Sequence, residues 1–154
     1  MKVLALMALT ALLTGCASLD RAQTEASRIA STTAANKKLV VDFYRVVFIE
    51  KRVAEGFERY VAPGYIQHNP MLPSGREAAV KFLTRAVTRD SISDIKRVIA
   101  EGDLVVLHVH SRNTLSDRGR AVVDIFRVAD GKIIEHWDVI QAVPAKSQNP
   151  NTMF

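Results

Sequence analysis

The sequence predicts an α+β domain in which helices cover one face of a bent antiparallel sheet. Three observations predict this class. Segments with the apolar spacing of helices come first, and four strand candidates follow in the second half of the chain. Short segments join these strands, which favours antiparallel neighbours. Helices followed by a run of strands are typical of α+β domains.

Residues 1–15 are predicted to be a signal peptide and not part of the fold. Lys2 precedes an apolar run, residues 3–13, that has the length of a secretory h-region and is too short for a stable membrane span. The run leads into Leu13-Thr14-Gly15-Cys16, which resembles the lipobox of bacterial lipoproteins. This resemblance implies that Cys16 is lipidated and anchors the protein in a membrane. The alternative is an unlipidated signal peptide, or an apolar helix with a chance cysteine.

Cys16 is the only cysteine, so an intramolecular disulfide is excluded, and lipidation explains a lone thiol in an exported protein. Because alanine and not aspartate follows Cys16, a Gram-negative cell would place the lipoprotein in its outer membrane, on the periplasmic face. Residues 16–35 are rich in Ala, Ser, Thr and Gln. This composition predicts a lipidated N-terminus and tether that forms helix only transiently.

The rest of the chain suffices for one domain with a modest core, residues 36–143, and a tail, residues 144–154. The tail is expected to wrap the domain edge or to lie disordered. The formal net charge of the chain is +5, but its basic residues are dispersed, without a stripe of lysine and arginine or interleaved aromatics. This distribution argues against nucleic acid as a partner.

Helices are predicted in the first part of the domain because three segments have amphipathic spacing: residues 39–50, 53–61 and 74–87. Asn36 is a candidate N-cap for the first helix. Pro63-Gly64 follows the second helix and is expected to end it. Ser74 and Glu77 have the spacing of a capping box at the start of the third.

Strands are predicted in four consecutive segments that are rich in β-branched and aromatic residues: residues 92–100, 104–111, 121–128 and 132–143. A short extended segment, residues 65–69, precedes them and stops at Pro70, which disfavours helix at the residue before it. The last two strands flank Asp130-Gly131, the strongest hairpin signal in the chain.

The last strand carries the densest set of chemical groups. Because strand side chains alternate between faces, His136 and Asp138 project together, while Glu135 and Trp137 project to the other side. Glu135 is interpreted as the partner of Arg127 in a cross-strand ion pair, which stabilises little if exposed.

The hairpin register decides what faces His136. A three-residue loop, residues 129–131, sets Asp124 opposite His136, and we prefer it because it groups Asp124, His136 and Asp138 on one face. A loop of only Asp130-Gly131 sets Ile125 opposite His136 instead.

Two segments, YIQHNP at residues 65–70 and DGKIIEHWDVIQ at residues 130–141, resemble the SnoaL-like group of the nuclear transport factor two-like superfamily. The resemblance covers roughly residues 36–143 and is closest to members labelled as predicted aldol-condensation enzymes. It implies a cone, in which a curved sheet of about four main strands and a short strand wraps around helices, with a pocket in the open end. Members include polyketide cyclases, ketosteroid isomerases and binding domains, so the fold does not settle the function.

In the cyclases that this chain resembles, an aspartate near the end of a late strand takes a proton α to a carbonyl. Asp138 best matches that aspartate by position, and an apolar pocket would raise its pKa toward neutrality. His68 and His136 are candidate general acids or oxyanion donors. The other candidates are pocket-lining, substrate-binding residues: Tyr65, Gln67, Asn69, His108, His110, Asp124 and Trp137. Gln67 and Asn69 share the face opposite to His68, so only one of these two sets can point inward.

No metal and no other cofactor is expected, because the resembling cyclases need none. The alternative is a zinc site in which His108 and His110 join His136 or His68. For each polar strand residue, a solvated or hydrogen-bonded structural role competes with a catalytic one. The sequence predicts an envelope-anchored lyase, isomerase or cyclase for a small carbonyl compound, and the alternative is a non-catalytic domain that binds a ligand or a partner. Related domains often pair through the sheet face away from the helices, which leaves a homodimer open.

Overall fold

The computed structural model describes residues 4–154, with side chains described from Asp20 onward. The chain divides into two compact units, residues 1–32 and 33–154. Residues 1–3 of the expected signal peptide and the side chain of Cys16, the expected lipidation site, lie outside the described part. Within that part, no helix combines the length and hydrophobicity that a membrane span requires.

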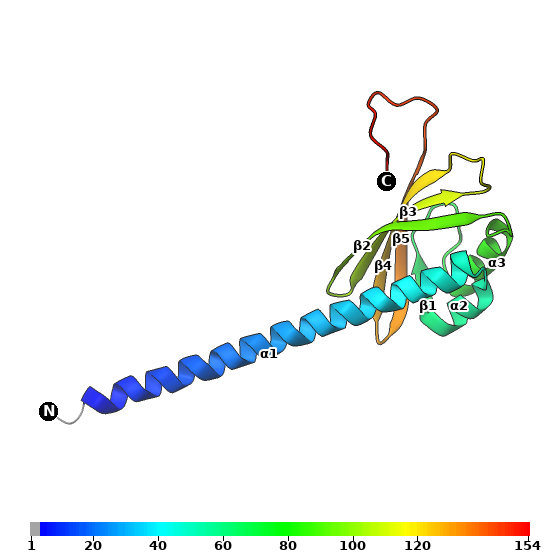
Figure 1. The fold of residues 1–154 in the computed structure, drawn as a ribbon. Helices are drawn as coiled ribbons and strands as arrows, with labels where there is room; N and C mark the ends of the chain where they lie inside the picture. Colours follow the sequence, from blue (N-terminus) through cyan, green and yellow to red (C-terminus); the bar gives the residue numbers. More distant parts are fainter. Residues whose placement is uncertain (1–3) are drawn as a thin grey trace. The chain divides into compact units, whose positions relative to one another are not determined.

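The first helix, α1, spans Leu4–Tyr44 and continues into a π-helix, η1, at Arg45–Ile49 (Figure 1). The predicted tether is therefore helical, which fits its many alanines and the Glu25–Arg28 ion pair one turn apart. The prediction of Asn36 as an N-cap is wrong because α1 runs through it. Its Nδ2 atom instead donates a hydrogen bond to the carbonyl oxygen of Gly102 at 2.9 Å.

Two further helices confirm the amphipathic spacing in the sequence: α2 at Val53–Tyr60 and α3 at Arg76–Ala86. The capping box predicted for α3 does not form. Gly75 occupies the N-cap position, and no side chain caps the helix. The hydroxyl of Ser74 instead accepts a hydrogen bond from the main-chain N–H of Gln67 at 3.1 Å, which ties the start of α3 to the end of the first strand.

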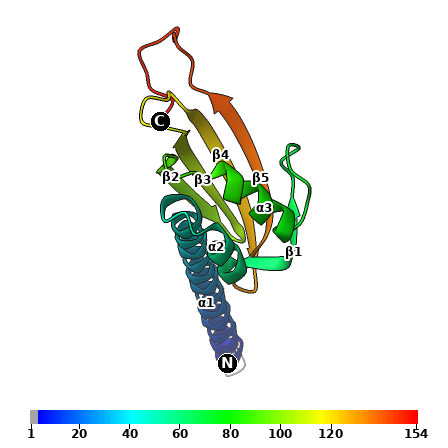
Figure 2. The same ribbon diagram turned by 90° about the vertical axis from the view of Figure 1, so that its right-hand side faces the viewer.

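The sheet has five strands, and the four main ones lie within one or two residues of the predicted bounds: β1 at Val61–Gln67, β2 at Ile92–Glu101, β3 at Leu104–Arg112, β4 at Arg120–Ala129 and β5 at Lys132–Ala142. Their order is β1-β5-β4-β3-β2, with β1 parallel to β5 and the other pairs antiparallel (Figure 2). Strand β1 is longer than predicted and contains Pro63, which an edge strand tolerates because it needs no N–H on its open side.

The β4–β5 hairpin has neither of the two predicted registers. Its loop is Asp130-Gly131, and both residues have positive φ angles, 50° and 69°, as a type I′ turn requires. A bulge then adds one residue to β5, because Arg127 pairs with Glu135 while Val128 pairs with Ile133.

Beyond the bulge, Asp124 pairs with Asp138 and Phe126 pairs with His136. The extra residue changes which residues pair, so that Asp124 faces Asp138 and not His136. The side chains of β5 nevertheless point to the same faces of the sheet as they would with a three-residue loop. The predicted grouping of Asp124, His136 and Asp138 on one face is therefore present, although the predicted partners were wrong.

The hydrophobic core lies between the helices and one face of the sheet. Phe43 of α1 is central to it. Its ring makes edge contacts with Phe57 of α2 and Phe126 of β4, at centroid distances of 5.3 and 5.8 Å. These contacts hold the end of α1 and the short α2 against the strands that carry the polar residues.

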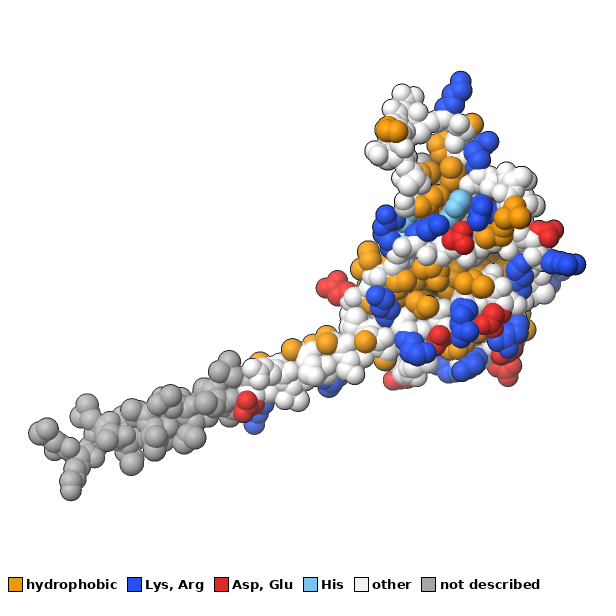
Figure 3. All heavy atoms as spheres, viewed as in Figure 1, with side chains coloured by type: hydrophobic (Ala, Val, Ile, Leu, Met, Phe, Trp, Pro, Cys, Tyr) orange, Lys and Arg blue, Asp and Glu red, His pale blue; other side chains and the backbone are white. Residues whose placement is uncertain are grey.

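The other face of the sheet carries the C-terminal tail. The ring of Phe154 stacks on His110 and His108 of β3, at centroid distances of 4.1 and 5.6 Å. The end of the tail therefore lies against the outer face of the sheet, whereas the sequence predicted a tail that wraps the domain edge or lies disordered. On the face of the domain in Figure 3, acidic and basic side chains lie interspersed around a band of hydrophobic ones, which agrees with the dispersed charge of the sequence.

Candidate active site

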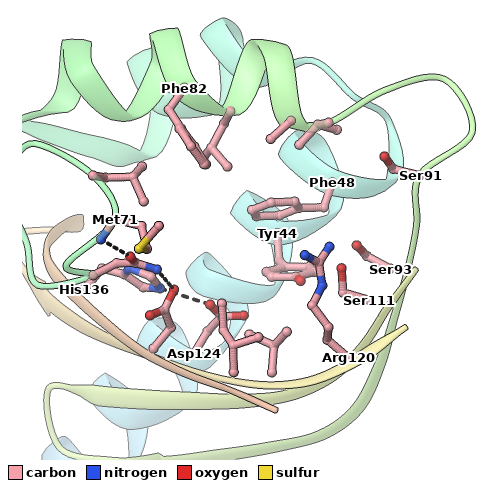
Figure 4. Close-up of a pocket in the computed structure, with 18 of the residues that line it drawn as sticks. Tyr44, Phe48, Met71, Phe82, Ser91, Ser93, Ser111, Arg120, Asp124 and His136 are labelled. Carbon is pink, nitrogen blue, oxygen red and sulfur yellow. Dashed lines mark hydrogen bonds and ion pairs between the residues drawn. The ribbon is translucent and has the colours of Figure 1, made fainter. Parts of the chain in front are cut away.

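A cavity of about 390 Å³ lies between the helices and the inner face of the sheet (Figure 4). This volume is in the range of small-molecule sites, which are mostly apolar with a few converging polar groups. The walls are mainly aromatic and aliphatic side chains: Phe43, Phe48, Phe57, Met71, Leu72, Phe82, Leu83, Phe126 and Ile140.

Strands β4 and β5 bring three titratable groups together at one end of this cavity. Asp124 and Asp138 are direct cross-strand partners, and His136 lies two residues before Asp138 on the same face. The Nε2 atom of His136 lies 3.0 Å from Oδ1 of Asp124. One ligand atom from each of the three residues lies within 4.8 Å of the others. His136 and Asp124 are buried, with 8% and 7% of their surface exposed.

The proton positions of His136 follow from its second contact, with Gln67 of β1. The Nδ1 atom lies 2.9 Å from Oε1 of Gln67, and this oxygen also accepts the main-chain N–H of Asn69 at 2.9 Å. Because a main-chain N–H only donates, the orientation of the Gln67 amide is fixed. Oε1 can only accept, so Nδ1 of His136 carries a proton.

The Asp124–His136 pair is therefore neutral overall. With Nδ1 protonated, the contact between Nε2 and Oδ1 holds one further proton, either on the carboxyl group or on the imidazole. Burial raises the pKa of Asp124 above its ordinary value, and the hydrogen bond from His136 opposes this rise. The pair adds no net charge to this end of the cavity.

Asp138 has a separate hydrogen-bond partner. Its Oδ2 atom accepts a hydrogen bond from Nδ2 of Asn69 at 2.6 Å. The Asn69 amide is oriented in turn by the main-chain N–H of Met71, which donates to Oδ1 of Asn69 at 2.8 Å. A buried amide thus holds one oxygen of a carboxylate that lines an apolar cavity.

Tyr65 lies at this end, and a second phenol, Tyr44, lies farther along the cavity beside Ser93. The hydroxyl of Tyr65 accepts a hydrogen bond from Nε2 of Gln67 at 3.0 Å. Burial raises the pKa of both phenols, and the nearby carboxylate of Asp124 adds to the rise. Both therefore stay protonated and able to donate hydrogen bonds to a ligand.

His68 was predicted to be a catalytic residue in the cavity, but its side chain points away from the cavity. Gln67 and Asn69, on the opposite face of this segment, point inward instead. The ring of His68 lies on the outer face, where Nε2 contacts Oε1 of Glu135 at 2.7 Å. It stacks on Trp137 at a centroid distance of 4.7 Å, so Trp137 is also outside the cavity lining. The predicted Arg127–Glu135 ion pair forms on this face, with Nη1 and Oε2 2.9 Å apart.

His108 and His110 also lie outside the cavity, against the prediction that they bind substrate. They project from the face of β3 opposite to the buried Val105, Leu107 and Val109. A zinc site that joins them to His136 is therefore excluded by geometry. In the described part of the chain, a metal ion would find its nitrogen and oxygen ligands only at Asp124, His136 and Asp138.

Comparison with known proteins decides the family. Residues 40–136 match the SnoaL-like domain. This chain belongs to the SnoaL-like family. No curated protein sequence matches it.

Solved structures similar to this SnoaL-like domain share its fold at low sequence identity. A "putative ketosteroid isomerase" from Kribbella flavida is 19% identical, with a TM-score of 0.61 over 76% of this chain and 85% of that protein. A "putative polyketide cyclase" from Acidithiobacillus ferrooxidans is 24% identical, with a TM-score of 0.58 over 69% and 87%. An NTF2-like protein of unknown function from Burkholderia xenovorans is 12% identical, with a TM-score of 0.63 over 76% and 91%.

Sequence reasoning missed one part of the SnoaL-like cavity, the polar end opposite Asp124. This end is lined by residues from three strands and the segment before them: Ser91, Ser93, Ser111, Arg112 and Arg120. For Arg120 a signal existed, because it lies four residues before Asp124 in one strand and must share its face. The contributions of Tyr44 and Phe48 had no such signal, since only the packing of α1 and η1 aims them at the sheet.

Proposed function

We propose that this SnoaL-like domain catalyses proton transfer α to the carbonyl of a small compound, in a cyclase, lyase or isomerase reaction that needs no cofactor. The single observation that supports this most is the placement of Asp138 in an apolar cavity beside a neutral Asp124–His136 pair. Membership of the SnoaL-like family adds support.

In the proposed mechanism, Asp138 is the base. Its carboxylate takes a proton from the carbon next to the carbonyl, the C–H electron pair forms a carbon–carbon double bond, and the carbonyl oxygen becomes an enolate. Because the Asp124–His136 pair carries no net charge, it adds no negative charge beside Asp138. The negative charge that develops on the enolate is therefore not repelled by a second carboxylate.

The phenols are the proposed enolate donors. Tyr65 has its oxygen engaged as an acceptor by Gln67, which leaves its proton for the ligand. Tyr44 is a second protonated phenol in the cavity lining. In isomerisation, the enolate takes the proton back from Asp138 at another carbon. In an aldol ring closure, the enolate carbon attacks a second carbonyl, the C=O electron pair moves to oxygen, and the resulting alkoxide takes the proton from Asp138.

Hydrogen exchange tests this proposal without knowledge of the natural substrate. The full-length protein is incubated with 2-acetylnaphthalene in D2O, and loss of the methyl signal is followed by proton NMR. We expect exchange above the buffer rate, reduced at least about 100-fold by Asp138→Asn, as general base catalysis implies. Exchange at the buffer rate, or exchange that does not depend on Asp138, contradicts the proposal.

The second candidate is a non-catalytic ligand-binding domain, which the mainly apolar walls of the cavity favour. The same experiment separates the two. A ligand-binding domain broadens the ketone signals by binding but leaves the methyl protons unexchanged, with equal affinity in the wild type and in Asp138→Asn.

We also propose that the domain is carried in the cell envelope by a lipid on Cys16, because Leu13-Thr14-Gly15-Cys16 resembles a lipobox. Metabolic labelling with an alkyne fatty acid, followed by membrane fractionation, tests this. We expect label and membrane association in the wild type and loss of both in Cys16→Ser. If the wild type incorporates no fatty acid and associates with membranes to the same extent as Cys16→Ser, the lipid anchor is ruled out.

A further inference from the structure

The end of the cavity opposite Asp124 is polar and carries positive charge. The pairing of three strands sets its residues in one row, since Ser93 of β2 faces Ser111 of β3, and Ser111 faces Arg120 of β4. Side chains directly opposite each other in a sheet lie about 4.5–5.5 Å apart at Cβ. Figure 4 shows the two hydroxyls and the Arg120 guanidinium directed toward the same part of the cavity, away from His136.

Two arginines line this end, and among the described residues only Arg112 forms a direct ion pair with a carboxylate. Nη2 of Arg112 pairs with Oδ2 of Asp94 at 3.0 Å. Nη2 of Arg120 donates to Oδ1 of Asn113 at 3.0 Å, and this amide brings no charge. Asp117, in the loop before β4, lies close enough to Arg118 and Arg120 to interact with their charges. Counting Arg112, Arg118, Arg120, Asp94 and Asp117, this end keeps one excess positive charge. In addition, Nε of Arg112 is buried without a hydrogen-bond partner in the described part of the chain, which is unusual for a buried polar atom.

The distance between the two polar ends follows from the strand. Arg120 and Asp124 lie four residues apart on the same face of β4, which corresponds to about 13 Å at roughly 3.3 Å per residue. Val122 lies between them on that face, and Phe48 and Tyr44 line the same space. The cavity therefore has an anion-attracting end, an apolar middle and a carboxylate–imidazole end.

We infer that this arginine–serine end binds the carboxylate of a ligand whose carbonyl lies at Asp138, so that the substrate class is a keto acid with an apolar, ring-sized spacer. The placement of the carbonyl rests on the proposed function, whereas the carboxylate site does not. A guanidinium presents two parallel N–H donors that match a carboxylate, and serine hydroxyls supply further donors. One excess positive charge at this end suits a monoanion better than a phosphate dianion.

Binding of three rigid probes tests the inference. The probes are 6-acetyl-2-naphthoate, its neutral amide and 6-acetyl-2-naphthyl phosphate, measured by isothermal titration calorimetry with the full-length protein at pH 7. We expect the carboxylate to bind at least tenfold more tightly than the amide and more tightly than the phosphate, with a preference that falls as salt rises.

The variants locate the carboxylate site. Arg120→Gln is expected to abolish the preference for carboxylate over amide. Arg97→Gln is the matched control, because it removes the same charge from β2 at a side chain that contacts His108 on the outer face. If Arg120→Gln lowers the melting temperature, Arg120→Lys keeps the charge without the planar fork and is expected to retain part of the preference.

Each outcome decides the inference. No measurable binding of the carboxylate, equal binding of carboxylate and amide, a preference for phosphate, or a preference that survives Arg120→Gln overturns it. Asp138→Asn separates it from the proposed function. If Asp138→Asn keeps the carboxylate preference, but neither the wild type nor this variant catalyses exchange of the ketone methyl protons, the carboxylate site stands and the catalytic proposal fails. If proton exchange depends on Asp138 but the wild type shows no preference for the carboxylate, the catalytic proposal stands and the carboxylate site is overturned.

Discussion

Nδ2 of Asn69 donates a 2.6 Å hydrogen bond to Oδ2 of Asp138, which joins the segment after β1 to β5 within the cavity lining. The two residues are 69 positions apart in the chain. Asn69 is itself fixed by the N–H of Met71, so the carboxylate is held by a preorganised donor. If Asp138 is the proposed base, its second oxygen is thereby presented to a ligand in a defined position.

Replacing Asn69 by alanine tests that role. Asn69→Ala removes the donor to Asp138 and leaves the carboxylate free to rotate, so we expect exchange of 2-acetylnaphthalene to slow by about tenfold or more. The rates are measured by NMR in D2O. Asn151→Ala, in the exposed C-terminal tail, is the control for loss of an amide, and its exchange rate is expected to match the wild type. An unchanged rate in Asn69→Ala contradicts the role.

Gln67 is predicted to contribute to stability through the groups that it satisfies. Gln67→Leu leaves Nδ1–H of His136 and the N–H of Asn69 without their acceptor, and each buried unsatisfied group costs about 1–3 kcal/mol. Urea unfolding is expected to show a total loss of about 2–6 kcal/mol for the two groups. Gln141→Leu, at an exposed position of β5, is the matched control and should change stability by less than about 0.5 kcal/mol. Equal unfolding midpoints for wild type and Gln67→Leu would refute the network.

Asp124 gives a prediction for the pH dependence of stability. Burial raises the pKa of its carboxyl in the folded state, so the folded protein holds this proton more strongly than the unfolded chain. The stabilisation from that proton is present at acidic pH and is lost as pH rises through the raised pKa. Asparagine at this position cannot lose a proton as pH rises. The melting temperature of Asp124→Asn minus that of the wild type should therefore increase from pH 4 to pH 8.

The comparison is made by differential scanning fluorimetry in buffers of equal ionic strength. Asp103→Asn, an exposed position with 61% of its side-chain surface accessible, controls for general effects of charge. A difference between wild type and Asp124→Asn that stays constant across this pH range contradicts a raised pKa for Asp124.

His68 is predicted to be dispensable for proton transfer. Its ring lies outside the cavity lining, between Glu135 and Trp137. His68→Ala should keep the exchange rate within about twofold and lose about 0.5–1.5 kcal/mol of stability with the aromatic stack. A 100-fold slower exchange in His68→Ala would place it in the mechanism after all.

Much of the fold was predictable because its signals are local. Alternation along β5 separates His136 and Asp138 from Glu135 and Trp137, and this separation is independent of which strand lies next to β5. The bounds of the main strands followed from β-branched runs and the Asp130-Gly131 turn for the same reason. Local pattern thus identified the face of the sheet that carries the site.

What the sequence did not reveal depends on contacts between distant segments. The bulge that sets Asp124 opposite Asp138 has no local signature, so the register was wrong. Whether His68 or its neighbours face inward depends on how β1 pairs with β5. The predicted helix start at Asn36 was wrong because α1 runs through it, and the side chain of Asn36 instead contacts Gly102, 66 residues away.

The most direct test of the account is chemical rescue at Asp138. Asp138→Ala removes the proposed base and leaves space for a small carboxylate in a cavity that is otherwise unchanged. We predict that this variant loses exchange of the ketone methyl protons and that added formate restores part of the rate in a saturable way, whereas chloride at the same ionic strength does not. Exchange at the wild-type rate in Asp138→Ala without formate would contradict the claim that Asp138 is the base.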